Sequence, residues 1–173
     1  TAYMVRAIEG AGYSTEEIGI ALDVASTEFY KDGAYHMDGK SLSGEELSDI
    51  YAGWVDEYPL LSIEDGFAED DWRSWSHCMR DIGDKVQLVG DDLFVTQTER
   101  LAMGIETKAA NAILVKVNQV GTITETLETM DMASANGFNS VVSHRSGETE
   151  DTTISDIAVG TRAGQILSLI HIS

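Results

Sequence analysis

The sequence predicts an α/β fold built from parallel strands, arranged as a sheet or a (β/α) barrel. Strand-like and helix-like segments alternate, with one strand and one helix in roughly 25 to 30 residues. The strand-like segments are apolar on both faces, which is typical of parallel strands that are covered by helices. The segments between them have apolar residues at helical spacing.

The elements follow one another in a regular order. Apolar runs predict strands at 18–24, 60–63, 86–89, 112–117 and 140–142, and helical spacing predicts helices at 43–58, 70–82, 97–106, 122–136 and 152–165. Gly137 suits the end of the fourth helix, and residues 31–40 are expected to form a loop. A capping-box pattern opens three of the helices, at Ser43/Glu46, Thr96/Glu99 and Thr122/Glu125.

The composition excludes several classes of function. The 173 residues include 30 acidic and 11 basic ones, for a formal net charge of -19, so nucleic acid and anionic membranes are not expected partners. No apolar run is long enough to span a bilayer, and no signal peptide is recognisable. Cys78 is the only cysteine, which excludes an internal disulfide and favours a cytoplasmic location.

A polar residue ends each predicted strand. These residues are Asp23, Glu64, Asp91, Lys116 and His144, and the spacings from Glu64 onward are 27, 25 and 28 residues. The carboxyl ends of parallel strands meet at one face of a barrel, where such enzymes have their active sites. Because side chains alternate along a strand, all five can point toward one site.

The three acids among these residues predict a metal site. Asp23, Glu64 and Asp91 would repel one another in a low-dielectric interior, and a divalent cation removes that cost. Oxygen ligands favour Mg²⁺ or Mn²⁺ over zinc. Each acid alone is better explained by a salt bridge or a helix cap, but their shared position at strand ends favours the metal.

Lys116 has apolar neighbours on both sides in the segment 112–117 (AILVKV). A lysine at a sheet edge can extend its ammonium group to water. Alternatively, a desolvated lysine loses its proton more readily and can act as a general base. A metal, a lysine base and an anion clamp together suggest proton abstraction next to a carboxylate.

The anion clamp is predicted in the segment 143–151 (SHRSGETED), between a short strand and the start of a helix. His144, Arg145 and Ser146 stand side by side there. Arginine binds phosphate or carboxylate oxygens through two N–H groups at once, and serine hydroxyl and backbone N–H groups complete such an anion-binding site. The segment alone fits a polar loop that caps the next helix equally well, and the strand-end residues favour the binding site.

These segments resemble enolase, the phosphopyruvate hydratase family of glycolysis, over about residues 1–166. The metal-ligand pattern also fits racemases and lactonising enzymes of the enolase superfamily, whereas SHRSGETED points to enolase itself. The matching segments are ALDVASTEFYKDG (21–33), SIEDGFAEDDW (62–72), VQLVGDDLFVT (86–96), ILVKVNQVGTITET (113–126) and VVSHRSGETEDTTI (141–154).

The resemblance implies the reversible dehydration of 2-phosphoglycerate to phosphoenolpyruvate, with Mg²⁺ as cofactor. A lysine base with Mg²⁺ stabilising the ene-diolate is the chemistry of the enolase superfamily. Enolases are generally homodimers or octamers, so the full-length protein is expected to be one of these. The implied roles are Mg²⁺ ligation by Asp23, Glu64 and Asp91, proton removal by Lys116, phosphate and second-Mg²⁺ contacts by Arg145 and Ser146, and substrate contacts by His144, Glu64, Asp91 and Lys116.

The chain also departs from the family. A complete barrel needs about 250 residues, so residues 1–166 are expected to be part of the C-terminal catalytic barrel domain, incomplete at both ends. The family has a substrate-binding lysine after Ile166, where this chain has Leu167. Residues 167–173 match nothing in the family and are expected to be foreign.

The isolated chain is therefore expected to be inactive, and its function is expected within a full-length enolase. The alternatives are a non-catalytic remnant of the barrel and another lyase or isomerase of the superfamily.

Overall fold

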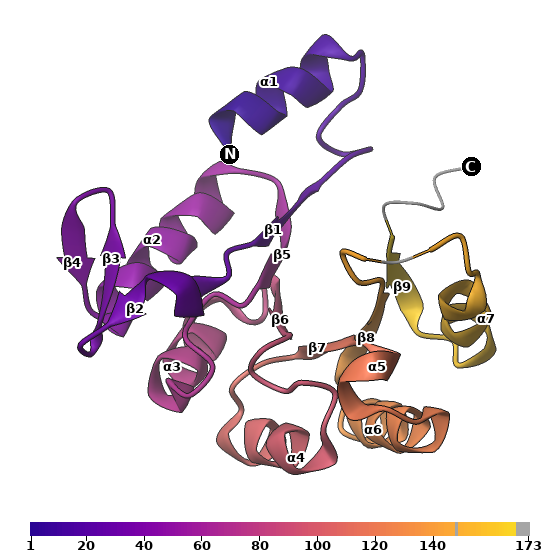
Figure 1. Ribbon diagram of the computed structural model, residues 1–173. Coiled ribbons are helices and arrows are strands. Elements are labelled where there is room, and N and C mark those ends of the chain that lie inside the picture. Colours follow the sequence, from indigo (N-terminus) through magenta and orange to yellow (C-terminus); the bar gives the residue numbers. More distant parts are fainter. Residues whose placement is uncertain (148, 169–173) are drawn as a thin grey trace. The chain divides into compact units, whose positions relative to one another are not determined.

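The computed structural model describes residues 1–147 and 149–168 (Figure 1). The chain divides into two compact units, Thr1–Val89 and Gly90–Ser173. Glu148, from the predicted anion clamp, and residues 169–173, from the predicted foreign tail, lie outside the described residues.

In the first unit, three strands pair in parallel in the order β1-β5-β6. The predicted strands and helices here lie within two residues of their expected positions. The elements are α1 (Ala2–Gly10), β1 (Ile20–Asp23), the 3₁₀ helix η1 (Ser26–Phe29), β2 (Tyr30–Lys31), β3 (Ala34–Met37), β4 (Lys40–Leu42), α2 (Gly44–Glu57), β5 (Leu60–Glu64), α3 (Trp72–Ile82) and β6 (Gln87–Gly90).

The predicted loop at residues 31–40 is wrong, because the segment forms antiparallel strands β2, β3 and β4, which lie beside α2 in Figure 1. Its turns are two Asp-Gly pairs. Asp32 and Gly33 have φ of 53° and 82°, and Asp38 and Gly39 have φ of 50° and 73°. Positive φ at both central residues is what a two-residue hairpin turn needs to match the twist of its strands. The turn chemistry therefore overrides the low strand propensity of the flanking residues.

The core of the first unit is a cluster of four aromatic rings. The Phe67 ring centroid lies 5.9 Å from Tyr35, 5.6 Å from Tyr51 and 5.9 Å from Trp75, each with edge-to-face geometry. All four side chains are at most 1% exposed. Because they come from β3, α2, the β5–α3 loop and α3, the cluster ties the hairpin strands to the helices.

The second unit pairs its strands in the order β7-β8-β9, again all parallel. Every residue of β7 is buried, as its apolar sequence predicts. The elements are α4 (Thr98–Thr107), β7 (Ala112–Val115), α5 (Val117–Val120), α6 (Ile123–Ala135), β8 (Asn139–Ser143), α7 (Thr153–Gly160) and β9 (Gly164–Leu167).

Two predicted elements of this unit end early. The strand expected to reach Val117 stops at Val115, and the next residues turn into the short helix α5. The helix expected to reach Gln165 stops at Gly160, and residues 164–167 form β9 instead. Gly164 has φ of 78°, which a helix cannot continue through.

Of the three predicted capping pairs, Ser43/Glu46 forms a complete capping box, and Thr122/Glu125 forms only the bond from the N-cap side chain. The Ser43 hydroxyl accepts the Glu46 N–H at 3.2 Å while the Glu46 carboxylate accepts the Ser43 N–H at 2.8 Å. The Thr122 hydroxyl accepts the Glu125 N–H at 3.2 Å. Gly137 follows the end of α6 with φ of 75°, as expected for a helix stop.

The predicted fold class is confirmed. Apart from the antiparallel strands β2, β3 and β4, each unit is built of parallel strands connected through helices, which is the repeat of a partial (β/α) barrel. Among the described residues, no helix has the length and apolar character needed to cross a membrane.

Cys78 on α3 is fully buried, as expected for a small apolar residue, and burial raises the pKa of its thiol from 9.0 to about 11. Above pH 9 the thiol ionises in the unfolded chain but stays neutral in the folded one. We therefore expect the free energy of unfolding to fall as pH rises from about 9 toward about 11.

Urea unfolding at pH values below and within this window tests the expectation, with Cys78→Ala as the comparison. The variant should lose less stability across the window than the parent. Equal losses would assign the whole effect to other groups, such as the buried phenols of Tyr35 and Tyr51, whose pKa values burial also raises.

Candidate active site

In the first unit, two predicted metal ligands occupy equivalent positions on neighbouring parallel strands. Asp23 ends β1, Glu64 ends β5, and the two are register partners. The pairing continues past the strands, because Val24 N–H donates to the Glu64 carbonyl at 3.0 Å and Ser26 N–H donates to the Asp65 carbonyl at 3.0 Å. The backbone therefore holds the two carboxylates side by side at the carboxyl ends of β1 and β5.

The loop that follows Glu64 is fixed by hydrogen bonds to one carbonyl. The Gly66 carbonyl accepts from the Ser26 hydroxyl at 2.8 Å and from the Tyr51 hydroxyl at 2.8 Å. The residue before it, Asp65, is buried with φ of 43°, a left-handed conformation that costs energy for a residue with a Cβ. The two donors stabilise this turn immediately after Glu64.

A second buried phenol holds the same loop further along. The Tyr35 hydroxyl accepts the Ala68 N–H at 3.0 Å and donates to Asp71 Oδ2 at 2.8 Å. The other Asp71 oxygen accepts the Ser74 N–H at 3.2 Å and caps α3. Burial raises the pKa of Tyr35, so the phenol remains a neutral donor at ordinary pH.

The shared Gly66 carbonyl makes a non-additive stability effect expected. Tyr51→Phe and Ser26→Ala each leave one donor in place, so each should lower the free energy of unfolding by about 1 kcal/mol. The double variant removes both donors from a buried carbonyl and should cost about 1–3 kcal/mol beyond the sum. Urea unfolding of the parent, the two single variants and the double variant measures this coupling. Strictly additive losses would show that the two hydroxyl groups do not share the Gly66 carbonyl.

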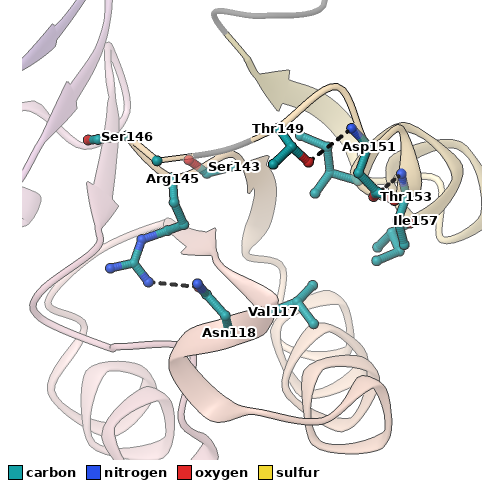
Figure 2. A pocket seen from close by; sticks show the side chains of 11 residues that line it. Val117, Asn118, Ser143, Arg145, Ser146, Thr149, Asp151, Thr153 and Ile157 are labelled. Carbon is teal, nitrogen blue, oxygen red and sulfur yellow. Dashed lines mark hydrogen bonds between the residues drawn. The ribbon is translucent and has the colours of Figure 1, made fainter.

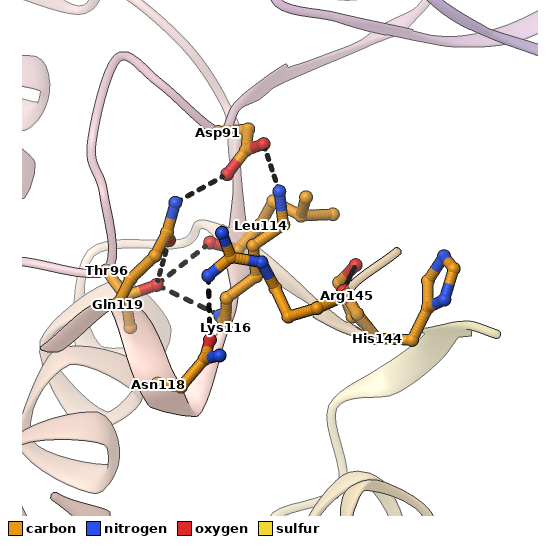
Figure 3. Close-up of polar contacts among 9 residues, drawn as sticks. Asp91, Thr96, Leu114, Lys116, Asn118, Gln119, His144 and Arg145 are labelled. Carbon is orange, nitrogen blue, oxygen red and sulfur yellow. Dashed lines mark hydrogen bonds and ion pairs between the residues drawn. The ribbon is translucent and has the colours of Figure 1, made fainter. Parts of the chain in front are cut away.

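In the second unit, the predicted base and the third predicted metal ligand form a partly buried ion pair (Figure 3). Asp91 follows β6, Lys116 follows β7, and Lys116 Nζ contacts Asp91 Oδ2. Their side chains are 16% and 11% exposed, in the order Lys116 and Asp91. Lys116 is thus not a lysine that extends into water from a sheet edge. Removing one partner of such a pair leaves the other charge desolvated.

Thr96 and Gln119 join this pair in one hydrogen-bonded network. Gln119 Nε2 donates to Asp91 Oδ1 at 3.2 Å, and the Thr96 hydroxyl donates to Gln119 Oε1 at 3.0 Å. The Thr96 oxygen also accepts the Lys116 backbone N–H at 3.0 Å.

The prediction that Thr96 and Glu99 form a capping box is therefore wrong. Helix α4 begins after Gln97, and its described N-terminus has no side-chain capping bond from that residue. Val95 and Thr96 both have positive φ, of 44° and 56°, which turns the Thr96 hydroxyl toward β7 instead of along the helix. A tertiary contact thus replaces the local one.

Sequence reasoning missed Thr96, Asn118 and Gln119 as residues of the candidate site. Asn118 and Gln119 lie on α5, which begins at Val117 directly after Lys116. Two adjacent amide side chains at the end of an apolar strand could have indicated them. An amide can donate and accept hydrogen bonds at the same time, so it can connect other polar groups of a site.

The predicted anion clamp lies on the loop after β8 and borders a cavity of about 690 Å³ (Figure 2). Arg145 reaches from this loop toward α5, where one terminal nitrogen donates to Asn118 Oδ1 at 2.7 Å. The other described lining residues are Val117, Ser143, Ser146, Gly147, Thr149, Asp151, Thr153, Ile154 and Ile157.

This cavity combines a guanidinium group with four hydroxyl groups, of Ser143, Ser146, Thr149 and Thr153, and an apolar wall that includes Val117. Arginine and hydroxyl donors are the groups that bind phosphate or carboxylate oxygens. The carboxylate in the lining, Asp151, accepts the Thr153 N–H at 2.9 Å at the start of α7.

His144 occupies the position between β8 and the clamp. Its N–H donates to the Leu167 carbonyl at 2.9 Å, which extends the pairing of β8 with β9. Within the described part of the chain, His144 is outside the set of residues that line the cavity. The structure thus places Arg145 and Ser146 on one cavity and His144 at the adjoining strand end.

The chain was compared with models of known protein families. The family described as "Enolase, C-terminal TIM barrel domain" matches residues 1–169, nearly the whole of the 173-residue sequence. The match agrees with the parallel βα units of both parts of the chain and with the acidic and basic residues at their strand ends. The chain belongs to the family of enolase C-terminal TIM barrel domains.

Proposed function

We propose that this chain takes part in the reversible, Mg²⁺-dependent dehydration of 2-phosphoglycerate to phosphoenolpyruvate, as part of a full-length enolase. The observation that carries the proposal is the buried pair of Lys116 and Asp91 at the ends of two strands in a chain of this family. A buried lysine at such a strand end has the position expected of a catalytic group in a (β/α) barrel.

The donor atoms suit a hard divalent cation. Asp23 and Glu64 are carboxylates in register on neighbouring strands, and Asp91 is a third carboxylate at a strand end. We assign Mg²⁺ ligation to these three residues, because oxygen-only ligand sets favour Mg²⁺ over zinc. When bound, the cation would supply positive charge that stabilises the dianion formed by proton loss next to a carboxylate.

Lys116 is the proposed base: in its neutral amine form, Nζ would take the proton from C2 of 2-phosphoglycerate and become an ammonium group. Arg145 and Ser146 are proposed to bind the phosphate group, and His144 to contact the substrate from the neighbouring strand end. Asn118 holds one nitrogen of Arg145, so that the remaining guanidinium N–H groups are available to an anion. The hydroxyl that leaves C3 needs a proton from an acid, which the resemblance to enolase places outside residues 1–166.

One observation favours a second candidate, a non-catalytic remnant of the barrel. Enolases are expected to have a lysine that binds the substrate carboxylate where this chain has Leu167. Leu167 ends β9 in register with Ser143, and its backbone carbonyl accepts from His144. A leucine side chain at this position cannot bind a carboxylate.

A hybrid enzyme separates the two candidates. Residues 1–166 would replace the matching segment of a full-length enolase, so that the host lysine follows Ile166, and a second hybrid would extend to Leu167. We expect the first hybrid to form phosphoenolpyruvate from 2-phosphoglycerate with Mg²⁺, as measured by ultraviolet absorbance. The second should lose most of this activity.

The outcomes distinguish the candidates directly. A folded first hybrid without activity would refute the proposed function, whereas activity in the first hybrid alone would show that Leu167 by itself abolishes activity and would favour the remnant. Turnover of a racemase or lactonising substrate in place of 2-phosphoglycerate would favour another member of the superfamily. Circular dichroism confirms that each hybrid is folded before its activity is interpreted.

The remaining expectations concern the full-length protein. We propose that residues 1–166 belong to its catalytic barrel domain and that it is a cytoplasmic homodimer or octamer. The proposed foreign tail, residues 167–173, begins within the stretch that the family model matches, which extends to residue 169.

A further inference from the structure

We infer that Gln119 and Thr96 are positioning residues that hold the Asp91 carboxylate and the Lys116 main chain in one relative orientation. The inference goes beyond the proposed function in naming residues that support the base, and its catalytic consequence rests on that function. Its structural basis is a closed ring of hydrogen bonds (Figure 3).

The ring has only one possible direction. The Asp91 carboxylate can only accept, so the nitrogen of the Gln119 amide must face it, at 3.2 Å. The amide oxygen then faces Thr96 and must receive its hydroxyl proton, at 3.0 Å. Thr96 is left with lone pairs, and one of them accepts the backbone N–H of Lys116 at 3.0 Å. The Lys116 ammonium returns to the other Asp91 oxygen and closes the ring.

The ring is anchored to the rest of the second unit. The Thr96 carbonyl accepts the hydroxyl of Thr129 on α6 at 3.1 Å, and both threonines are fully buried. Gln119 lies on α5, whose start is fixed by the end of β7. Gln119 and Thr96 form a relay of hydrogen bonds between the Asp91 carboxylate and the Lys116 backbone, and both have buried or helical supports. They can therefore restrain Asp91 more firmly than the flexible lysine side chain could alone.

The amide at position 119 is not replaceable by similar side chains. Glutamate cannot donate to Asp91 and would add a like charge, and asparagine is one methylene shorter. Methionine has a similar length and no hydrogen-bonding amide, so Gln119→Met tests the relay with little change in volume. Gln97, which is exposed at the start of α4, provides the matched control Gln97→Met.

The first test uses the 173-residue chain and needs no cofactor or substrate. Amide hydrogen exchange, followed by ¹⁵N NMR, reports on the Lys116 N–H that Thr96 accepts. Thr96→Val removes this acceptor and should speed Lys116 exchange at least tenfold, while Thr96→Ser should restore the parent rate. Thermal unfolding of both variants shows whether a rate change is local. Equal Lys116 exchange in the valine and serine variants would overturn the relay.

The second test uses the first hybrid enzyme. Gln119→Met should lower kcat at least tenfold while KM for 2-phosphoglycerate changes less than threefold, because the substrate contacts remain and the base is misplaced. Gln97→Met should leave both values unchanged. Unchanged kcat in Gln119→Met would overturn the positioning role. An inactive parent hybrid, combined with the expected exchange rates, would refute the proposed function and leave the relay supported.

Discussion

Replacing Lys116 with methionine in the first hybrid enzyme is expected to lower kcat by about 10²- to 10⁴-fold, the usual contribution of a general base. Methionine fills similar space but cannot take a proton. The measurement is phosphoenolpyruvate formation, together with exchange of the C2 hydrogen of 2-phosphoglycerate with solvent, followed by NMR. Both rates should fall, because the proposed base acts at the step that they share.

A second lysine offers a matched control. Lys85 Nζ also pairs with an aspartate, lying 2.9 Å from Asp56 Oδ1, but the two side chains are 52% and 68% exposed. Exposed pairs contribute little, so Lys85→Met should change neither rate by more than about twofold. Loss of dehydration with C2 exchange retained would show that Lys116 is not the base.

The buried pair also predicts a stability difference between the two lysines in the 173-residue chain. Lys116→Met leaves the Asp91 carboxylate without its ammonium partner, whereas Lys85→Met leaves a solvated carboxylate. Removing one partner of a buried pair typically costs about 3–5 kcal/mol. Urea unfolding measures this cost and shows how far Lys116→Met destabilises the chain, and a smaller cost would indicate that water reaches the Asp91 carboxylate in the variant.

Phe67→Ala is expected to lower the free energy of unfolding of the chain by about 3–5 kcal/mol. The Phe67 side chain is 1% exposed and contacts the rings of Tyr35, Tyr51 and Trp75 edge-on. The substitution removes these ring contacts and leaves a cavity that the surrounding rings cannot readily fill. Urea unfolding followed by tryptophan fluorescence measures the loss.

Tyr3→Ala is the control for this substitution, because Tyr3 is 82% exposed on α1. Its expected effect is within about 0.5 kcal/mol, as for most surface substitutions. A loss in Phe67→Ala as small as in Tyr3→Ala would mean that the aromatic cluster repacks around the missing ring. The loop after Glu64 would then depend on its hydrogen bonds alone.

The elements that could be predicted from sequence are those set by local apolar patterns. Residues 112–115 are apolar throughout and form a fully buried parallel strand, and Ser43 with Glu46 caps α2 as its spacing indicates. Residues 60–63 also form a parallel strand, in which Leu60 and Ile63 are buried while Leu61 is exposed. The strand-end position of Lys116 was predictable for the same reason. Its buried contact with Asp91 required the three-dimensional arrangement of β7 and the residues that follow β6.

The errors came from competition between local signals and other interactions. Thr96 has the sequence spacing of a helix cap, but its hydroxyl bonds Lys116 and Gln119. Residues 31–40 contain a single strong strand former, Tyr35, yet two Asp-Gly turns bring them into a hairpin sheet. Residues 164–167 follow a helix closely, and their pairing with β8 depends on residues more than twenty positions earlier.

The pairing of β1 with β5 has a consequence for synthesis on the ribosome. Domains generally fold as units, beginning with the part that is made first. The register of Asp23 with Glu64 involves only the first 64 residues. The two hydrogen bonds to the Gly66 carbonyl need only residues 26, 51 and 66. A nascent chain can therefore assemble two carboxylates of the proposed Mg²⁺ site before Lys116 has been translated.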